Sequence, residues 1–334
     1  MDVLTPVKID KAYERIQSLI VKTPLIISET INKKVNANVY FKLENLQRTG
    51  SFKIRGASNK ISQLSNEEKS RGVVAYSSGN HAQAVAYVSN IFNVKSTIVI
   101  PRNAPSIKIE NTKKYGAKIV MYDVNHDNRE KITSEIASKE NKTIIKPYDD
   151  LDIIAGQGTV GKEIAEELQE RNIKPDIYLC CCGGGGLIAG SSTYLKHVFP
   201  NIKNFSVEPE DFNDTQLSLQ DNSIVANKES AKSICDALLA PHPGNLTFSI
   251  NKTTLAGGLS VSDKEVKKTI IELAENMKII VEPGGSVAAA ALLTNKIIVE
   301  NKNVIVMISV GNIDYNFFSL PVFLFYLFQN LNEV

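Results

Sequence analysis

The hydrophobic and polar positions of this chain form short apolar runs that alternate with amphipathic segments. Ile9, Ala12, Ile16 and Leu19 recur at helical spacing and predict a first helix. Apolar runs that predict buried strands follow at 39–43, 73–76, 97–100, 118–122, 177–182, 204–207 and 304–308. Helices are predicted from about Ile54, Asn80 and Pro105 onward and over 128–139 and 158–170.

This alternation predicts the fold class. Uninterrupted apolar strands separated by helices are typical of parallel sheets that are covered on both faces, which indicates an α/β protein. The strands are too many for one small domain, so we expect two parallel-sheet α/β domains with a ligand between them.

Composition and charge exclude several classes of protein. The chain has 334 residues, of which 43% are hydrophobic and 22% charged, as in an ordinary globular protein. Its net charge of +2 gives no electrostatic case for binding nucleic acid. No apolar run reaches the roughly 20 residues of a membrane-spanning helix. The nearest, at 317–328, is short and is interrupted by Pro321.

The cysteines suit neither a metal cage nor a disulfide framework. Three of the four, Cys180, Cys181 and Cys182, are adjacent, and neighbours on a strand point to opposite faces. We expect them and Cys235 to be small buried residues of a cytoplasmic protein.

The first candidate for chemistry is Lys53. It stands between Phe52 and Ile54, just before the small residues Gly56 and Ala57. Partial desolvation at such a position lowers the pKa of a lysine and frees its amine for Schiff-base chemistry. A lone lysine in a partly apolar stretch is more often a surface residue, so the other motifs decide its interpretation.

The second candidate is a run of four glycines after the strand at 177–182, which we call the glycine cradle: Gly183, Gly184, Gly185 and Gly186. Glycines let backbone N–H groups converge on an anion, and the N-terminus of the helix that follows adds its positive dipole end. The cradle therefore predicts a phosphate site. Gly184, Gly186 and Ala189 also match a dinucleotide fingerprint, with Glu208 as its acid, so a nucleotide ligand stays open.

Two polar segments lie at predicted strand ends. The first contains Ser77, Ser78, Asn80 and His81 where a helix begins, and its hydroxyl and N–H groups suit a carboxylate. The second contains Ser309, beyond the strand at 304–308, and open α/β sheets bind ligands at such strand ends. One ligand would use all these features: an aldehyde for the lysine, a phosphate for the cradle, and an aromatic ring with a hydroxyl and a nitrogen. That ligand is pyridoxal 5′-phosphate (PLP), an electron sink for carbanions at the α-carbon of amino acids.

The segments at 51–57, 77–83, 183–190 and 309–312 resemble the serine/threonine dehydratase and serine racemase family, PLP enzymes of the tryptophan-synthase-β-like fold type II. The resemblance runs from residue 5 to residue 314. It implies two α/β domains with the cofactor in the cleft between them. The large cofactor-binding domain would comprise 1–68 and 147–314, and the small domain, 69–146, would bind the substrate carboxylate. Residues 315–334 form an apolar tail that is atypical of the family.

The resemblance also implies roles for single residues. Lys53 would bond the cofactor aldehyde, Phe52 would pack beside the ring, and Asn80 would bind its hydroxyl. Ser309 would bind the pyridine nitrogen, the glycine cradle would bind the phosphate, and Glu282 would lie close to the cofactor.

On the substrate side, the resemblance implies binding by Ser77, Ser78, Asn80 and His81, and Arg129 falls where serine racemases carry an arginine near the carboxylate. Ser78 is a second catalytic candidate, because racemases use this hydroxyl as an acid and base opposite the lysine.

A divalent-ion site is implied as well. The family's ligands fall on Glu208, the Phe212 carbonyl and Asp214, and oxygen ligands suit Mg²⁺ or Ca²⁺. The alternative is that this segment is an acidic surface loop.

The leading hypothesis is PLP-dependent β-elimination of L-threonine or L-serine to a 2-oxo acid and ammonia. Serine racemase is an alternative, although the segment 235–240 lacks the serine that racemases place near Ala240. A 3-hydroxyaspartate dehydratase is another, with Arg129 and His242 as candidate cations for the second carboxylate. A non-enzymatic amino-acid or nucleotide sensor also stays open. The expected partners are a small hydroxy amino acid and a second copy of the chain in a homodimer.

Overall fold

The computed structural model describes residues 3–77 and 79–314. Its α-helices are α1 (Pro6–Ile16), α2 (Glu29–Val35), α3 (Lys53–Ser62), α4 (Asn66–Arg71), α5 (Asn80–Ile91), α6 (Ser106–Lys114), α7 (Arg129–Glu140), α8 (Leu151–Glu170), α9 (Gly186–Val198), α10 (Asp214–Asp221), α11 (Asn245–Thr254), α12 (Asp263–Met277) and α13 (Pro283–Leu293). Three short 3₁₀ turns are η1 (Glu44–Leu46), η2 (Glu210–Phe212) and η3 (Asp236–Leu238).

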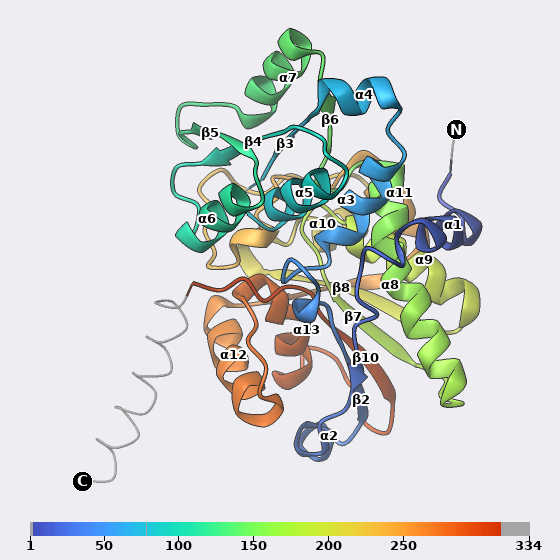
Figure 1. Cartoon of the computed structure of the whole chain (residues 1–334). Coiled ribbons are helices and arrows are strands. Elements are labelled where there is room, and N and C mark those ends of the chain that lie inside the picture. The colour runs from blue at the N-terminus through green and yellow to red at the C-terminus, as the bar shows by residue number, and fades with distance from the viewer. Residues whose placement is uncertain (1–2, 78, 315–334) are drawn as a thin grey trace.

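The strands are β1 (Leu25–Ile26), β2 (Asn38–Leu43), β3 (Val73–Tyr76), β4 (Ser96–Pro101), β5 (Lys118–Tyr122), β6 (Thr143–Ile144), β7 (Ile177–Cys181), β8 (Lys203–Pro209), β9 (Leu255–Val261) and β10 (Asn303–Ile308). They form a six-stranded sheet in the order β1-β2-β10-β7-β8-β9 and a four-stranded sheet in the order β5-β4-β3-β6. Figure 1 shows the small sheet above the large one. All neighbouring strands run parallel except β1 and β2.

The predicted α/β fold with parallel sheets is confirmed. The apolar runs supply the central strands of the large sheet, where Val304 lies between Val39 on β2 and Ile177 on β7. Helix α13 packs on one face of this sheet, and all its residues are buried. The strands of the small sheet all lie between residues 73 and 144. The exact domain boundaries stay a prediction.

Some elements differ from the sequence prediction. The short strands β1 and β6 and the strand β9 were not predicted, because they lack a clear apolar run. Helix α8 begins at Leu151, not at 158 as predicted. The Asp150 carboxylate caps it by accepting hydrogen bonds from the N–H groups of Asp152 and Ile153. Gly156, Gly158 and Gly161 lie inside the helix.

Those glycines let α8 lie very close to two neighbouring helices. A Cβ on Gly156 would come within 2.6 Å of the Arg55 carbonyl oxygen on α3, and one on Gly161 within 2.6 Å of the Ser191 carbonyl oxygen on α9. Helix α8 therefore holds α3 and α9 at fixed positions. Because α3 begins at Lys53 and α9 begins in the glycine cradle, this packing sets the distance between the two candidate sites.

All four cysteines are free and buried, as the sequence indicates. Among the helices at 3–77 and 79–314, none is long and apolar enough to cross a membrane. The apolar tail at 315–334 lies outside the described residues.

Candidate active site

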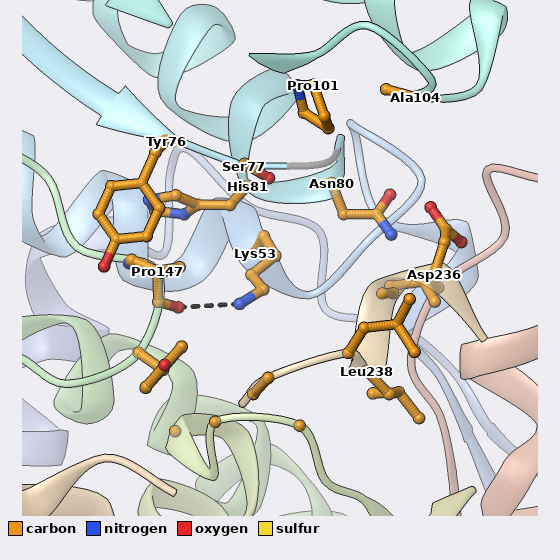
Figure 2. A pocket seen from close by; sticks show the side chains of 18 of the residues that line it. Lys53, Tyr76, Ser77, Asn80, His81, Pro101, Ala104, Pro147, Asp236 and Leu238 are labelled. Atoms are coloured by element: carbon orange, nitrogen blue, oxygen red, sulfur yellow. Dashed lines mark hydrogen bonds between the residues drawn. The ribbon is translucent and has the colours of Figure 1, made fainter. Parts of the chain in front are cut away.

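A cavity of about 330 Å³ lies between the two sheets. Its wall contains predicted site residues from the parts of the chain that form each of the two sheets. They are Phe52, Lys53, Ser77, Asn80, His81, Arg129, Gly183, Gly184, Gly185, Gly186 and Ser309. In Figure 2, Lys53 lies in the middle of the cavity, with Ser77 and His81 above it and Leu238 on the opposite wall. The structure thus brings together segments that are far apart in the sequence.

Lys53 is the first residue of α3, and its side chain reaches into the cavity. Its amine donates a hydrogen bond to the Pro147 carbonyl oxygen at 2.8 Å and lies 5.1 Å from the centre of the Phe52 ring. No carboxylate in the described chain forms an ion pair with this amine. Burial therefore lowers the pKa of Lys53 to about 8. At this pKa, more of the amine is neutral and nucleophilic near neutral pH than in a solvent-exposed lysine.

Amine labelling across a pH series tests this shift. In cofactor-free protein, acetylation of Lys53 is expected to rise with pH and to reach half its plateau near pH 8, because only the neutral amine reacts. Lys60 on the same helix is the internal control: burial lowers its pKa, but hydrogen bonds to Asp150 and Asp152 outweigh this and raise it. Peptide mass spectrometry measures both rates. A midpoint for Lys53 at or above that of Lys60 would contradict the assignment.

Backbone hydrogen bonds hold the Lys53 segment against the Ser309 segment. The Phe52 N–H donates to the Ser309 carbonyl oxygen at 3.2 Å, and the Gly311 N–H donates to the Gly50 carbonyl oxygen at 2.9 Å. Gly50 has a φ of +67°, which favours glycine. Ser309 follows β10 directly and is almost fully buried. The start of α3 and the end of β10 therefore form one wall of the cavity.

The glycine cradle forms another wall, between the end of β7 and the start of α9. Gly185 caps α9 with a φ of +90°. A Cβ on Gly184 would lie 2.3 Å from ring atoms of Tyr148, so only glycine leaves this wall open beside that ring. Backbone N–H groups at the N-terminus of α9 thus border the cavity, which is the arrangement that binds phosphate.

Asn80 begins α5 and is held on both sides of its amide. Its Nδ2 donates to Glu282 Oε1 at 2.7 Å, and its Oδ1 accepts from Asn312 Nδ2 at 2.7 Å. Lys108 Nζ lies 3.2 Å from the same Glu282 oxygen. Burial raises the pKa of Glu282 to about 7, against the opposing effect of Lys108. Glu282 is not among the described residues of the cavity wall, but it holds Asn80, which is.

Two further residues of the predicted substrate segment line the cavity. His81 is buried, and its Nε2 lies 3.0 Å from the Ile145 carbonyl oxygen, while its Nδ1 has no partner in the described chain. Burial, followed by the charge of Lys53, lowers the pKa of His81 to about 3, so the imidazole is neutral. The Ser77 hydroxyl accepts a hydrogen bond from the Gly79 N–H at 3.0 Å. Ser78 lies outside the described residues.

Arg129 begins α7 and lines the cavity. Its guanidinium carbon lies 5.2 Å from the centre of the Tyr76 ring, a distance typical of a cation–π contact. Among the described residues, no carboxylate lies within ion-pair distance of this guanidinium. It is available to an anionic ligand group.

The predicted metal ligands lie away from the cavity, at the ends of β8 and η2. The Glu208 carboxylate accepts hydrogen bonds from the N–H groups of Thr215 and Gln216 at 2.9 and 2.8 Å. Asp214 Oδ1 accepts from Asn227 at 2.6 Å, whereas its buried Oδ2 has no partner in the described chain. Burial raises the pKa of both acids, to about 7 for Asp214, and their mutual charge adds to the shift of Glu208.

This acidic pair fits a cation only in part. Asp214 has an unpaired carboxylate oxygen beside a second buried acid. A divalent ion would bind this oxygen and offset the repulsion between the two carboxylates. Within the described residues, however, no group of three or more His, Cys, Asp or Glu side chains could hold a metal. Further ligands would have to be carbonyl oxygens, such as that of Phe212, or water. Glu208 is also not among the described residues of the cavity wall, so it does not supply the acid of a dinucleotide site there.

Sequence reasoning missed several residues of the site. Cys181 lines the cavity, although the sequence suggested only a small buried residue. Tyr76, Pro147, Tyr148 and Asp236 also lie on its wall. The alternation of side chains along β7 could have shown that Cys181 faces the opposite side of the sheet from Cys180 and Cys182, but not which side borders the cavity.

The cavity fits a ligand with an aldehyde, a phosphate and an aromatic ring. A lysine of lowered pKa, an open glycine wall at a helix N-terminus and a buried serine hydroxyl face the same space. Each of these groups suits a different part of such a molecule.

Comparison with known proteins gives a consistent result. Residues 16–311 match the family model described as "pyridoxal-phosphate dependent enzyme". The chain is 43% identical to a serine racemase of Schizosaccharomyces pombe over 91% of this chain and 92% of that protein. It is 42% identical to an L-threo-3-hydroxyaspartate ammonia-lyase of Saccharomyces cerevisiae over 91% of both. The crystal structure of serine racemase from Dictyostelium discoideum superposes with a TM-score of 0.86 at 39% identity, covering 93% of this chain and 99% of that one.

These matches extend over nearly all the described residues and include a solved structure that superposes over almost the whole fold. They agree with the chemistry of the cavity, and the predicted fold type and cofactor are confirmed. The chain therefore belongs to the family of pyridoxal-phosphate-dependent enzymes.

Proposed function

We propose that this enzyme catalyses β-elimination of a small L-hydroxy amino acid, L-threonine or L-serine, to a 2-oxo acid and ammonia. The observation that carries the proposal is the convergence of Lys53, the glycine cradle and Ser309 on one cavity. Relatives named as threonine dehydratases support this reaction class, at 38% identity in Staphylococcus aureus.

Lys53 is the proposed base. PLP, when bound, supplies an electron sink for the negative charge that develops at the substrate α-carbon. The Lys53 amine would bond the cofactor aldehyde at rest and would take the α-proton once the substrate amine replaces it. Because the pKa of Lys53 is about 8, the same amine can accept and release a proton near neutral pH.

The other residues bind and orient. The N-terminus of α5, with Ser77 and the Asn80 N–H, would hold the substrate carboxylate. Ser309 offers a neutral hydroxyl to the ring nitrogen, with Phe52 beside the ring. A neutral partner does not enforce a protonated pyridine, which favours early loss of the β-hydroxyl over a long-lived carbanion.

The wall formed by η3 and the residues after it favours a substrate with a short apolar side chain. Ala237, Leu238, Leu239 and Ala240 line the cavity there, and the Asp236 carboxylate at the start of η3, which also lines the cavity, is paired with Lys108. An uncharged methyl or hydrogen packs against such a wall, whereas a carboxylate placed on it would lose hydration without a hydrogen-bond partner. This wall supports threonine and serine as substrates.

One observation favours a second candidate, elimination from 3-hydroxyaspartate. Arg129 lines the same cavity and could pair with a second carboxylate. Racemisation of serine would need a proton carrier opposite Lys53, and the sequence candidate for that role is Ser78.

A substrate panel separates these reactions. Wild-type enzyme is expected to form 2-oxo acid fastest from L-threonine or L-serine, because the cavity wall at 237–240 is apolar. An Arg129→Leu variant should raise KM for 3-hydroxyaspartate by about tenfold or more relative to any change in KM for L-threonine and L-serine, since only 3-hydroxyaspartate loses a charge-assisted contact to a second carboxylate. Oxo acid is measured by coupled dehydrogenase assay and recovered serine by chiral chromatography. Racemised serine with little pyruvate would refute the proposed elimination reaction. A strong preference for 3-hydroxyaspartate would refute the proposed substrate class.

We also propose that Glu208 and Asp214, with the Phe212 carbonyl, hold Mg²⁺ or Ca²⁺. The orphaned Asp214 Oδ2 supports this site. Saturating divalent ion is expected to raise the melting temperature by roughly 2–4 °C, because it binds only the folded chain. Asp214→Asn should remove the shift, and Asp211→Asn, on an exposed acid of the same segment, should keep it. Equal shifts in both variants, measured by differential scanning fluorimetry, would count against the site. The homodimer and the cytoplasmic location stay predictions.

A further inference from the structure

Cys181 differs from the cysteines on either side of it in where its side chain points. Cys181 is the last residue of β7 and lines the cavity, whereas Cys180 and Cys182 are not on the cavity wall. All three are buried, and Cys181 is only 3% exposed. Alternation along the strand explains the difference, because successive side chains point to opposite faces of a sheet.

The thiol of Cys181 contacts the hydroxyl of Ser309, a residue that lines the cavity. Cys181 Sγ donates a hydrogen bond to Ser309 Oγ at 3.0 Å, across the neighbouring strands β7 and β10. Ser309 is 1% exposed, and its backbone carbonyl oxygen accepts a hydrogen bond from the Phe52 N–H. Both partners are therefore fixed by the core of the large sheet.

This contact restricts what the serine can do. A hydroxyl has one proton to donate and lone pairs to accept with. When the thiol donates to Oγ, the serine proton must point elsewhere, and none of the hydrogen bonds between described residues has Ser309 Oγ as donor. The remaining direction is the cavity, where Ser309 forms part of the wall.

We propose that Cys181 is a positioning residue: its thiol orients the Ser309 hydroxyl so that the serine proton points to the ring nitrogen of the bound cofactor. This inference rests on the proposed role of Ser309 as the partner of that nitrogen. It makes the serine a donor and the nitrogen an acceptor. The nitrogen then stays unprotonated, which is the electronic state that favours elimination in the proposed reaction.

Four single variants and one double variant test the proposal; the fourth single variant, Ser309→Ala, is the background for the double variant. Cys181→Ala removes the donor, and Cys181→Ser replaces the thiol with a hydroxyl that can still donate. Cys180→Ala is the matched control, because it removes the same atom from the adjacent buried position that does not line the cavity. The readouts are the dissociation constant of PLP, titrated into cofactor-free protein, and the absorption spectrum of the bound cofactor.

Cys181→Ala is expected to weaken PLP binding by about three- to tenfold, the effect of losing one orienting hydrogen bond, and to shift the cofactor's absorption band. Cys181→Ser should restore both readouts to within about twofold of wild type. Cys180→Ala should leave the spectrum unchanged. Adding Cys181→Ala to a Ser309→Ala variant should have no further effect, because the thiol acts only through the serine.

Other outcomes overturn the proposal. Equal losses in the alanine and serine variants at position 181 would mean that size, and not hydrogen-bond donation, matters there. An undiminished effect of Cys181→Ala in the Ser309→Ala background would mean that the thiol acts independently of the serine. Failure of the proposed function itself looks different: the wild-type protein would then not bind PLP, or Ser309→Ala alone would change neither readout.

Discussion

Replacing Lys53 with alanine is expected to lower kcat/KM for L-threonine or L-serine by at least about 10³-fold, which general-base catalysis alone can account for. The variant loses the amine that is proposed to bond the cofactor and to move the α-proton. No second amine is placed to replace it among the described residues: Lys108, the other buried lysine near the site, is held by Asp236 and Glu282 at 2.8 and 3.2 Å.

Lys60→Ala is the matched control for this experiment, because Lys60 lies on the same helix and its amine points to Asp150 and Asp152 instead of the cavity. It should keep the wild-type rate to within about twofold, as a largely solvent-screened pair contributes little. Single-turnover assays with purified, cofactor-loaded protein measure the loss. A Lys53→Ala enzyme that retained a tenth or more of wild-type activity would disprove the assigned role.

Replacing Arg55 with alanine is expected to destabilise the protein by about 3–5 kcal/mol, the cost of breaking a buried ion pair by removing one partner. Arg55 is fully buried two residues after Lys53. Its guanidinium bonds both oxygens of Glu44 at 2.7 and 2.8 Å and both oxygens of Glu163 at 2.8 Å. Without it, two buried carboxylates keep only Lys42, which lies 2.9 Å from Glu163, as a cationic partner in the described chain.

The electrostatics of the network support this large effect. Burial opposes the charge of Arg55, but Glu44 and Glu163 outweigh burial and raise the pKa of the guanidinium. Arg55→Lys keeps the charge but not the paired contacts to both acids, so it should be destabilised to a lesser degree. Urea unfolding compares these variants with Lys60→Ala, which should cost less than about 1 kcal/mol. A loss for Arg55→Ala no larger than that of Lys60→Ala would contradict the account.

The Arg55 network also bears on function. It ties the first turn of α3 to η1 and to α8, the helix whose glycines fix α3 and α9 against each other. The buried charges thus support the geometry between Lys53 and the glycine cradle. Activity should fall in Arg55→Lys under conditions where the variant is still folded.

Much of the site could be predicted from the sequence, because its chemistry lies in local motifs. Lys53, the glycine cradle, Asn80 and Ser309 each sit where a strand ends or a helix begins, and strand ends in parallel sheets meet at one edge. Local pattern also predicted the central strands, since a buried parallel strand is a continuous apolar run.

The rest depends on tertiary contacts that no local pattern contains. Cys181 and Cys180 are the same residue type at adjacent positions, and only the register of β7 in the sheet decides that Cys181 faces the ligand. The position of Glu282 behind Asn80 arises from a hydrogen bond across 202 positions of sequence. The predicted start of α8 was too late: Gly156 lies inside the helix although glycine lowers helix propensity, because close packing against α3 requires it there.

Borohydride reduction followed by peptide mass spectrometry tests the central claim most directly. Reduction permanently fixes PLP to the amine that it is bonded to. If four segments of the chain form one cofactor site around Lys53, the added pyridoxyl mass appears on the peptide that contains Lys53, and the yellow colour of the protein disappears. Label on another lysine, such as Lys108, or bound PLP with no lysine labelled, would contradict the account.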